Sequence, residues 1–369
     1  MPAPRQSFAW RRTWIRAVLR AGSMRCPAVA RYPNRRGRSS TSVLAALNVH
    51  VGLCSAALCS PFKVHMAPIP LLIDTDPGVD DAWAILMAGR APGWQIQALT
   101  VVGGNVGLSA TCRNARILVD WLGQDIPIHA GASAPLLGGF GNAAHVHGQD
   151  GFGDAHWPDP QSVISDLPAA MAIVEHARLH AGRLQLLALG PLTNVALALR
   201  LEPALPQLID RLVVMGGALD GVGNLTDRAE FNVAFDPEAA EMVFRDWNRL
   251  DLMDWSNTLC VAPPIDRIEA LLSESTPWAQ RMQRCTRAVR TFLDDIGANT
   301  WALADPLAAH VLLDHPAGAG EACSVEVLLD QGPRRGETVM GSARTDRAQV
   351  HVAPLKAEDW WNAVCRAVR

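Results

Sequence analysis

The sequence predicts an α/β protein with a Rossmann-like, mainly parallel central sheet flanked by helices. Two observations support this fold class. From residue 69 onward, short apolar segments of strand length alternate with longer segments of helical period, which is the rhythm of βαβ units. Clusters of Asp, Gly and Asn directly follow several of the apolar segments, where ligands bind in open α/β sheets.

The expected elements follow in chain order. A first strand over residues 69–74 precedes the Pro77-Gly78 turn and a helix over 79–87. The next expected strands lie at residues 96–102, 127–130, 184–189 and 212–215, with helices among them at 108–122 and 166–180. After Pro263 the pattern is helical to about residue 313, and the remaining elements are strands at 324–329 and 349–352 and a helix at 357–368.

The first 65 residues differ in composition from the rest of the 369-residue chain. They are rich in arginine and contain no acidic residue, and no helical or strand period there would bury a face. An organellar transit peptide has this composition, whereas a secretory or twin-arginine signal fits it less well. Translation that begins at Met66 would explain it equally. We therefore expect residues 1–65 to be disordered or a non-native extension, and residues 66–369 to form one domain.

Charge is distributed unevenly along the chain. Eleven of the 33 basic residues but none of the 36 acidic residues precede Asp74, so the rest of the chain is strongly acidic. An acidic body argues against nucleic acid as a partner. The eight cysteines show no metal-ligand spacing, which suits reduced thiols in a cytoplasmic enzyme. No segment reaches transmembrane length, so no membrane partner is expected.

Four carboxylates stand within eight residues directly after the first expected strand, in the run Asp74-Thr75-Asp76-Pro77-Gly78-Val79-Asp80-Asp81. Like charges this close repel one another unless a cation lies among them. Asp80 or Asp81 would suit the first turn of the next helix, where the helix dipole favours negative charge, but Asp74 and Asp76 would remain unexplained. The run therefore predicts a site for a hard cation or for a cationic transition state.

Two other kinds of acidic site fit this run less well. An EF-hand loop that began at Asp74 would need an oxygen ligand at its fifth position, Gly at its sixth and Glu at its twelfth, but Gly78, Val79 and Ile85 stand there. An aspartyl-phosphate phosphatase also begins with Asp-x-Asp after a strand, with the first Asp as the nucleophile. The Pro-Gly turn and the second Asp pair do not belong to that pattern, which remains an alternative.

Several segments resemble, in the same order, motifs of the inosine–uridine-type nucleoside hydrolase family. The resemblance runs from the first strand to the C-terminus and implies the nucleoside hydrolase fold. The matching segments are DTDPGVDDAWAI from Asp74, TVVGGN ending at Asn105, HVHGQDGFG from His145, ALGPLTN from Ala188, VVMGG around Met215, Asn224, AEFNVAFDPEAA from Ala229, and Ala304-Asp305-Pro306.

The resemblance implies a Ca²⁺ ion at the bottom of a pocket. Its ligands would be the carboxylates of Asp76, Asp81 and Asp305 and the main-chain carbonyl of Leu189. Carboxylate and carbonyl oxygens are what a hard cation prefers, so the residue types agree with this set. Asp76 would also be the catalytic base that activates the attacking water, although a purely metal-binding role for Asp76 stays open.

The resemblance also implies a ribonucleoside substrate. The reaction would be Ca²⁺-dependent hydrolysis of the N-glycosidic bond by a metal-activated water through an oxocarbenium-like transition state, giving free nucleobase and ribose. The implied substrate-binding residues are Asp80 and Asn105 for ribose hydroxyls, Met215, and Asn224, Glu230 and Asn232 for the 5′-hydroxyl side. The last three could instead be capping residues of loops.

The sequence departs from the family pattern at Ala304, where many members have a His that protonates the leaving base. The purine-preferring branch also lacks this His and holds the base between aromatic rings. Trp301, one helical turn before Ala304, or Trp83 would serve here, although a Trp on a helix is more often part of the core. His147 is a further candidate for substrate contact, but neither His147 nor His145 can be assigned the acid role.

Ala304 leaves a second function open, a nucleoside- or ribose-binding protein with little turnover. The sequence does not indicate whether purine or pyrimidine bases are preferred. Family members are generally homodimers or homotetramers, and by analogy we expect the same of this chain.

Overall fold

A computed structural model describes residues 67–138, 141–352 and 355–369, so the expectations for residues 1–65 lie outside the described residues. Its strands are β1 (Ile69–Thr75), β2 (Trp94–Val101), β3 (Ile128–Ala130), β4 (Ile164–Ser165), β5 (Leu184–Ala188), β6 (Ile209–Met215), β7 (Arg249–Met253), β8 (Ala322–Val327), β9 (Thr338–Ser342) and β10 (Gln349–Val352).

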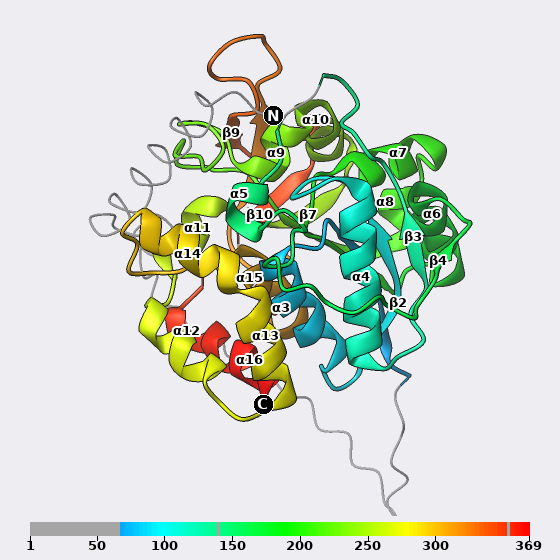
Figure 1. The fold of residues 1–369 in the computed structure, drawn as a ribbon. Helices are drawn as coiled ribbons and strands as arrows, with labels where there is room; N and C mark the ends of the chain where they lie inside the picture. The colour runs from blue at the N-terminus through cyan, green and yellow to red at the C-terminus, as the bar shows by residue number, and fades with distance from the viewer. Residues whose placement is uncertain (1–66, 139–140, 353–354) are drawn as a thin grey trace, which may run out of the picture.

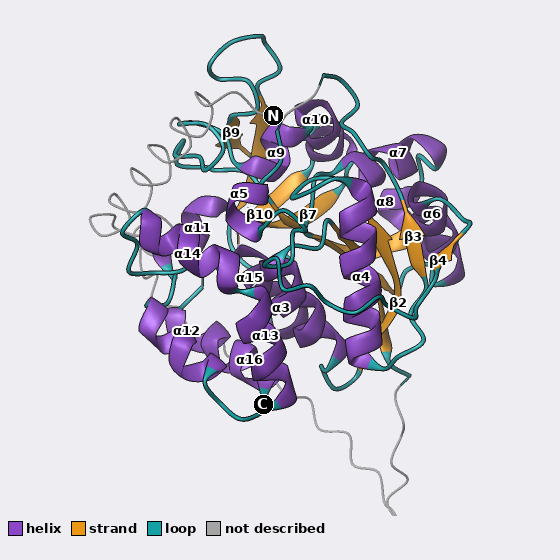
Figure 2. Cartoon of the chain, in the orientation of Figure 1, coloured by secondary structure: helices purple, strands orange, loops and turns teal. Residues whose placement is uncertain are grey.

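All ten strands join one sheet in the order β4-β3-β2-β1-β5-β6-β7-β10-β8-β9. Neighbouring strands are parallel from β4 through to β10, whereas β8 pairs antiparallel with both β10 and β9. The predicted α/β class with a mainly parallel sheet is therefore confirmed (Figure 2). Because β1 lies between β2 and β5, the loops that follow these three strands meet at one edge of the sheet.

Three strands were not expected from the sequence, and each has a physical reason. Strand β4 has only two residues. Strand β7 reads Arg-Leu-Asp-Leu-Met, and its buried Asp251 interrupts the apolar pattern of an interior strand. Strand β9 lies at the edge of the sheet and is exposed over most of its length, so burial does not impose an apolar alternation on it.

Helices cover both faces of the sheet (Figure 1). The described helices are α3 (Val79–Gly89), α4 (Leu108–Leu122), α5 (Ala144–His147), α6 (Ala169–Leu179), α7 (Thr193–Leu201), α8 (Leu205–Leu208), α9 (Phe231–Phe235), α10 (Pro237–Asp246), α11 (Trp255–Cys260), α12 (Ile265–Leu272), α13 (Pro277–Cys285), α14 (Arg287–Asp295), α15 (Ala304–Asp314) and α16 (Ala357–Val368). Among the described residues, no helix combines the length and the apolar character needed to cross a membrane.

The two faces of β1 belong to two separate hydrophobic cores. Leu71 and Ile73 pack into the core formed with α3, α4, α15 and α16, whereas Leu72 packs into the core formed with α6, α7 and α10. All three side chains are fully buried, because successive residues of a strand point to opposite faces and both faces are covered. The burial of β1 on both sides explains its continuous apolar sequence.

Helices α3 and α15 pack against each other and begin at the same edge of the sheet. Asp80 and Asp81 lie in the first turn of α3, and Asp305 lies in the first turn of α15. The side chain of Asp81 accepts hydrogen bonds from the backbone N–H of Gly78, at 2.8 Å, and from the hydroxyl of Thr75. The positive ends of two helix dipoles thus face a group of carboxylates.

A buried ion pair fixes the other end of α15. Arg211 on β6 donates to the carboxylate of Asp251 on β7 at 2.7 Å, and both side chains are less than a tenth exposed. Its remaining N–H groups donate to the carbonyl oxygens of Val311, Leu312 and His315 at 2.8–3.0 Å. The carbonyls at the C-terminal end of a helix lack a full set of intrahelical donors; here the Val311 carbonyl also accepts the N–H of His315 at 3.3 Å. Arg211 therefore joins two strands to the end of α15.

We expect Arg211→Ala to lower the free energy of unfolding by about 3–5 kcal/mol, because it leaves Asp251 charged and buried with no cationic partner, only the N–H of Gly318. Chemical denaturation monitored by circular dichroism measures this. The matched control is Arg200→Ala, which removes a half-exposed arginine paired with Asp246, and it should cost less than about 1 kcal/mol. Equal losses in the two variants would contradict the structural role given to Arg211.

Candidate functional site

A cavity opens beyond the carboxyl ends of the central strands. It collects side chains from the loop after β1, from β6 and from several helices and loops between residues 76 and 305. The residues proposed from the sequence that line it are Asp76, Asp80, Asn105, His147, Leu189, Met215, Asn224, Glu230, Asn232, Trp301 and Asp305. Asp81 is fully buried beside this cavity rather than on its wall.

Asp76 is held rigidly at the floor of the cavity. Its Oδ2 accepts a hydrogen bond from the backbone N–H of Asn105 at 2.7 Å, and the Asn105 amide donates to the carbonyl of Asp76 at 3.1 Å. The backbones of Gly104 and Gly190 lie close to the same carboxylate. A Cβ at Gly190 would lie 2.7 Å from Asp76 Oδ1, and one at Gly104 would overlap Oδ2. The two glycines therefore permit the buried position of Asp76.

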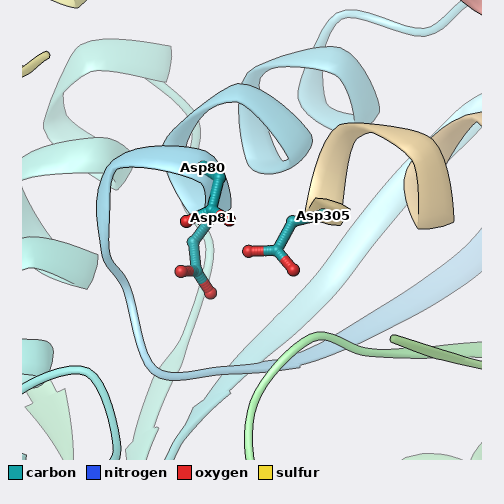
Figure 3. Close-up of side chains that lie close together, drawn as sticks. All are labelled: Asp80, Asp81 and Asp305. Atoms are coloured by element: carbon teal, nitrogen blue, oxygen red, sulfur yellow. The ribbon is translucent and has the colours of Figure 1, made fainter. Parts of the chain in front are cut away.

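Three carboxylates gather next to Asp76. Oxygen atoms of Asp80, Asp81 and Asp305 all lie within 4.8 Å of one another, although Asp305 is far from the other two in sequence (Figure 3). From the sequence, we predicted Asp76, Asp81 and Asp305 as metal ligands and Asp80 as a residue that binds a ribose hydroxyl. The structure places Asp80 in the same cluster as Asp81 and Asp305. Which of these carboxylates contact an ion remains a prediction.

Burial and mutual repulsion act on these carboxylates together. Burial raises the pKa of Asp80 to about 6. Burial first, and then the charges of Asp80, Asp81 and Asp76, hold the pKa of Asp305 well above its usual range. The pKa of Asp76 is raised in the same way, by burial and then by the charge of Asp81. All four cannot ionise cheaply without a positive charge among them.

The donor set fits a hard divalent cation. The cluster offers carboxylate oxygens from Asp80, Asp81 and Asp305. Within the described part of the chain, the buried Oδ1 of Asp80 accepts no hydrogen bond. The carbonyl oxygen of Leu189 accepts a 2.6 Å hydrogen bond from the side chain of Asn232. A carbonyl oxygen has two lone pairs, so this bond leaves one free for a metal. Oxygen-only ligation is typical of Ca²⁺.

Polar side chains form a second group along the cavity wall. Glu230 is the N-cap of α9 and accepts from the backbone N–H groups of Asn232, Gly217 and Val233 at 2.8–3.1 Å. Asn224 accepts from the N–H of Phe231 at 2.8 Å. Burial raises the pKa of Glu230 to about 7. These residues thus have the capping contacts that the sequence left open, and they also line the cavity.

An aromatic and aliphatic wall faces the polar groups. Trp301 contributes to it, as the sequence proposed, whereas Trp83 is fully buried in the core and does not line the cavity. Sequence reasoning missed the other members, which are Phe231, Trp255, Val289, Phe292 and Leu293. In α14 the apolar residues recur at i, i+3 and i+4, which predicts a buried face but does not show that this face borders a cavity.

His147 is neutral in this environment. The backbone N–H of Val79 donates to its Nδ1 at 3.2 Å, so the ring hydrogen must be on Nε2. Burial lowers the pKa of His147 to about 4. It is the only histidine among the described residues that line the cavity. His145 is exposed, and Ala304 stands directly before Asp305, at the position where the family pattern has a His. The cavity therefore contains no imidazolium near neutral pH.

A family model described as inosine-uridine preferring nucleoside hydrolase matches residues 71–362. The chain belongs to this family. The match includes part or all of every strand of the sheet and every residue of the cavity wall, and it confirms the family resemblance found in the motifs.

Individual nucleoside hydrolases support the assignment. The chain is 44% identical over 177 residues to a probable uridine nucleosidase 2 of Oryza sativa subsp. japonica, which covers 47% of this chain and 52% of that protein. A plant nucleoside hydrolase structure has a TM-score of 0.77 and 26% identity, covering 82% of this chain and 99% of that one. An inosine-guanosine nucleoside hydrolase structure has a TM-score of 0.74 and 30% identity over 81% of this chain and 98% of that one. The match thus spans about half the length of the rice relative.

We expect Asp305→Asn to stabilise the metal-free protein at about pH 8 and to have a smaller effect at about pH 5. The raised pKa of a folded-state carboxyl contributes stability below its unfolded value of 3.8, and this is lost as pH rises through the folded pKa. Asn cannot ionise, so it relieves the repulsion that develops at high pH. Thermal unfolding with a chelator measures the shift, and the exposed Asp330→Asn is the control.

Excess Ca²⁺ should reverse the order, so that the wild type becomes more stable than Asp305→Asn at about pH 8, because bound metal stabilises the folded state. A wild type that stays less stable than the variant in excess Ca²⁺ would contradict a cation site at Asp305.

Proposed function

We propose that this protein is a Ca²⁺-dependent ribonucleoside hydrolase that cleaves the N-glycosidic bond and releases a free nucleobase and ribose. One observation carries the proposal: a carboxylate cluster, a set of polar side chains and an aromatic wall meet in one cavity. Family membership supports the same reaction. A carboxylate-rich floor favours the positive charge that develops on the ribose as the bond breaks.

Asp76, Asp81, Asp305 and the Leu189 carbonyl are the proposed ligands of the ion. When bound, Ca²⁺ would hold ribose hydroxyls and make a water molecule more acidic. Asp80 belongs to the same cluster, so we assign it to a ribose hydroxyl beside the ion. Asn105 would accept a hydrogen bond from a second hydroxyl at its Oδ1, because its side-chain N–H groups already donate to the Asp76 carbonyl and to Asp81 Oδ2 at 3.1 and 3.2 Å.

Asp76 is the proposed general base. A base must be held within hydrogen-bond reach of the water it deprotonates, and Asp76 is fixed by the Asn105 N–H and by the backbones of Gly104 and Gly190. Burial raises its pKa and so strengthens it as a proton acceptor. Because Asn105 occupies Oδ2, the proton would be taken up at Oδ1.

Asn224, Glu230, Asn232 and Met215 are proposed to bind the 5′ side of the sugar. Asn232 is central among them, because its amide donates to the Leu189 carbonyl at 2.6 Å and lies 3.3 Å from the Met215 carbonyl. It therefore connects the sugar-binding wall to a proposed metal ligand. The capping bonds of Glu230 and Asn224 fix these side chains before substrate arrives, which lowers the entropic cost of binding.

Departure of the base must proceed without an imidazolium. Ala304 supplies no proton, and His147 is neutral with its hydrogen on Nε2, so it can donate a hydrogen bond but not a full proton. We propose that Trp301 stacks on the base, with Trp255 and Phe292 completing the wall. The named relatives include both a uridine nucleosidase and an inosine-guanosine nucleoside hydrolase, so the preferred base stays open.

Two alternatives follow from particular residues. The first alternative is a nucleoside- or ribose-binding protein with little turnover, and Ala304, which supplies no proton to the leaving base, favours it. An Asp-x-Asp phosphatase is disfavoured, since Asp74 is fully buried, accepts from Thr100 and Asn194 at 2.6 and 2.9 Å, and does not line the cavity. We further propose a cytoplasmic enzyme of nucleoside catabolism and base salvage that acts as a homodimer or homotetramer, by analogy with the family.

Reducing-sugar release from a panel of ribonucleosides, with and without a chelator, tests the activity. We expect turnover that requires Ca²⁺, and a loss of about 10²–10⁴-fold in kcat for Asp76→Asn, which removes the base and a charged ligand. Asp330→Asn should retain full activity. Metal-independent turnover would exclude the proposed mechanism, and tight nucleoside binding without base release over hours would favour the binding protein.

Trp301→Ala should lower kcat/KM for the preferred nucleoside about tenfold, because base stacking contributes roughly 1–3 kcal/mol. Trp301→Phe should retain most of the activity, since it keeps an aromatic ring. Inhibition by free ribose is the internal control and should not change in either variant. An equal loss of ribose and nucleoside affinity would show that Trp301 supports the pocket rather than the base.

A further inference from the structure

Three histidines lie together outside the cavity, at the edge of the sheet where β3 meets α6 (Figure 1). His129 comes from β3, His176 from the last turn of α6, and His180 is the C-cap that directly follows this helix. The ring centroids of His129 and His176 are 6.3 Å apart, and those of His176 and His180 are 6.2 Å apart. None of the three lines the proposed active site.

Each of these rings has a buried nitrogen without a hydrogen-bond partner, namely Nε2 of His129, Nδ1 of His176 and Nε2 of His180. A buried polar atom that lacks a partner costs about 1–3 kcal/mol. Three such atoms in one place indicate a missing ligand, because native structures leave few buried polar groups unsatisfied.

The hydrogen bond of His129 determines which of its nitrogens is free. Its Nδ1 lies 2.9 Å from the carbonyl oxygen of Leu167, which can only accept, so Nδ1 carries the hydrogen. In the neutral ring the lone pair is therefore on Nε2, the buried atom without a partner. A histidine that ligates a metal typically donates its other N–H to a backbone carbonyl in this way.

The pair on α6 has the spacing of a helical chelate. Residues four apart on a helix share a face, so both imidazoles can approach one ion. Burial, followed by the proximity of His129 and His180, lowers the pKa of His176, which keeps its lone pairs available near neutral pH. The charged neighbours that act on the pair are Glu175 on His176 and Arg183 on His180.

We propose that His129, His176 and His180 form a binding site for a divalent first-row transition ion such as Zn²⁺, distinct from the carboxylate cluster. Imidazole ligands suit Zn²⁺, Cu²⁺ and Ni²⁺, whereas Ca²⁺ prefers oxygen. With Zn–N bonds of about 2.0–2.1 Å, two rings on a tetrahedral ion stand about 5 Å apart between centroids. The structure holds the rings further apart, at 6.3 and 6.2 Å from His176, and the ligating nitrogens of the three histidines do not all lie within 4.8 Å of one another. The site therefore forms only when side-chain rotations bring His129 and His180 toward one ion beside His176.

Such an ion would link β3, the strand next to the edge strand β4, to α6. Strand β3 is short, and its outer neighbour is the two-residue β4, so this edge has little backbone pairing of its own. A bond from His129 through the metal to the helix would stabilise the folded state without entering the nucleoside cavity. Thermal stability should therefore respond to the ion, and catalysis should not.

Zn²⁺ binding to the full chain in millimolar Ca²⁺ tests the proposal, because Ca²⁺ occupies the carboxylate cluster. Competition with a chromophoric chelator gives the affinity, and thermal unfolding gives the stabilisation. We expect His176→Gln and His180→Gln each to weaken Zn²⁺ binding at least about tenfold and to abolish the rise in Tm. The control Leu179→Ala changes an exposed neighbour on the same helix and should bind as the wild type does.

His129→Gln distinguishes three ligands from two. Gln can still donate to the Leu167 carbonyl, and the Tm of the metal-free variant shows whether the buried site has kept its fold. Zn²⁺ affinity should fall about tenfold in this variant as well. Wild-type affinity in His129→Gln or in His180→Gln would overturn the three-histidine site, and so would a wild type that binds no Zn²⁺ under these conditions. Nucleoside hydrolysis in Ca²⁺ should be unchanged in His180→Gln.

Discussion

Repulsion among buried carboxylates is the constraint on which the rest of this structure depends. Asp76, Asp81 and Asp305 are buried and Asp80 beside them is half-buried, which is unfavourable unless their charge is offset. Two helix N-termini, and backbone N–H groups that donate to Asp76 and Asp81, offset part of this negative charge. The remainder requires a cation, and the same excess of negative charge suits a reaction whose transition state is positive.

Residues that hold the backbone and residues that face the cavity are largely the same. Glu230 caps α9, Asn224 accepts from the N–H of Phe231, and Asn105 fixes Asp76 through its own N–H, and all three line the cavity. From the sequence, helix or loop capping and ligand binding are alternatives for Asn224, Glu230 and Asn232. In the structure, a residue such as Glu230 caps a helix and also lines the cavity. A side chain that caps a helix at the carboxyl edge of a sheet is already rigid and already points where ligands bind.

The sequence was most informative where a local pattern carries the structure. The buried strand β1, the turn at Pro77 and the acidic start of α3 could be read from adjacent residues, and the motif order predicted the family. Strand β7 could not be predicted in this way, because an interior strand is normally recognised by its apolar residues. In β7 the charged Asp251 is buried as the partner of Arg211 on the neighbouring strand. The wall formed by Phe292 on α14 was hidden for a related reason: helical periodicity shows that a face is buried, not what it faces.

The distance along the chain between the two halves of the carboxylate cluster has a consequence for biosynthesis. Asp80 and Asp81 leave the ribosome early, whereas Asp305 follows only after seven of the strands in the sheet have been made. Until α15 docks on α3, the nascent chain holds an incomplete set of donors with weak affinity for any ion. At the proposed cation site, metal capture would thus be a late event that follows completion of the fold and would favour full-length chains over truncated ones.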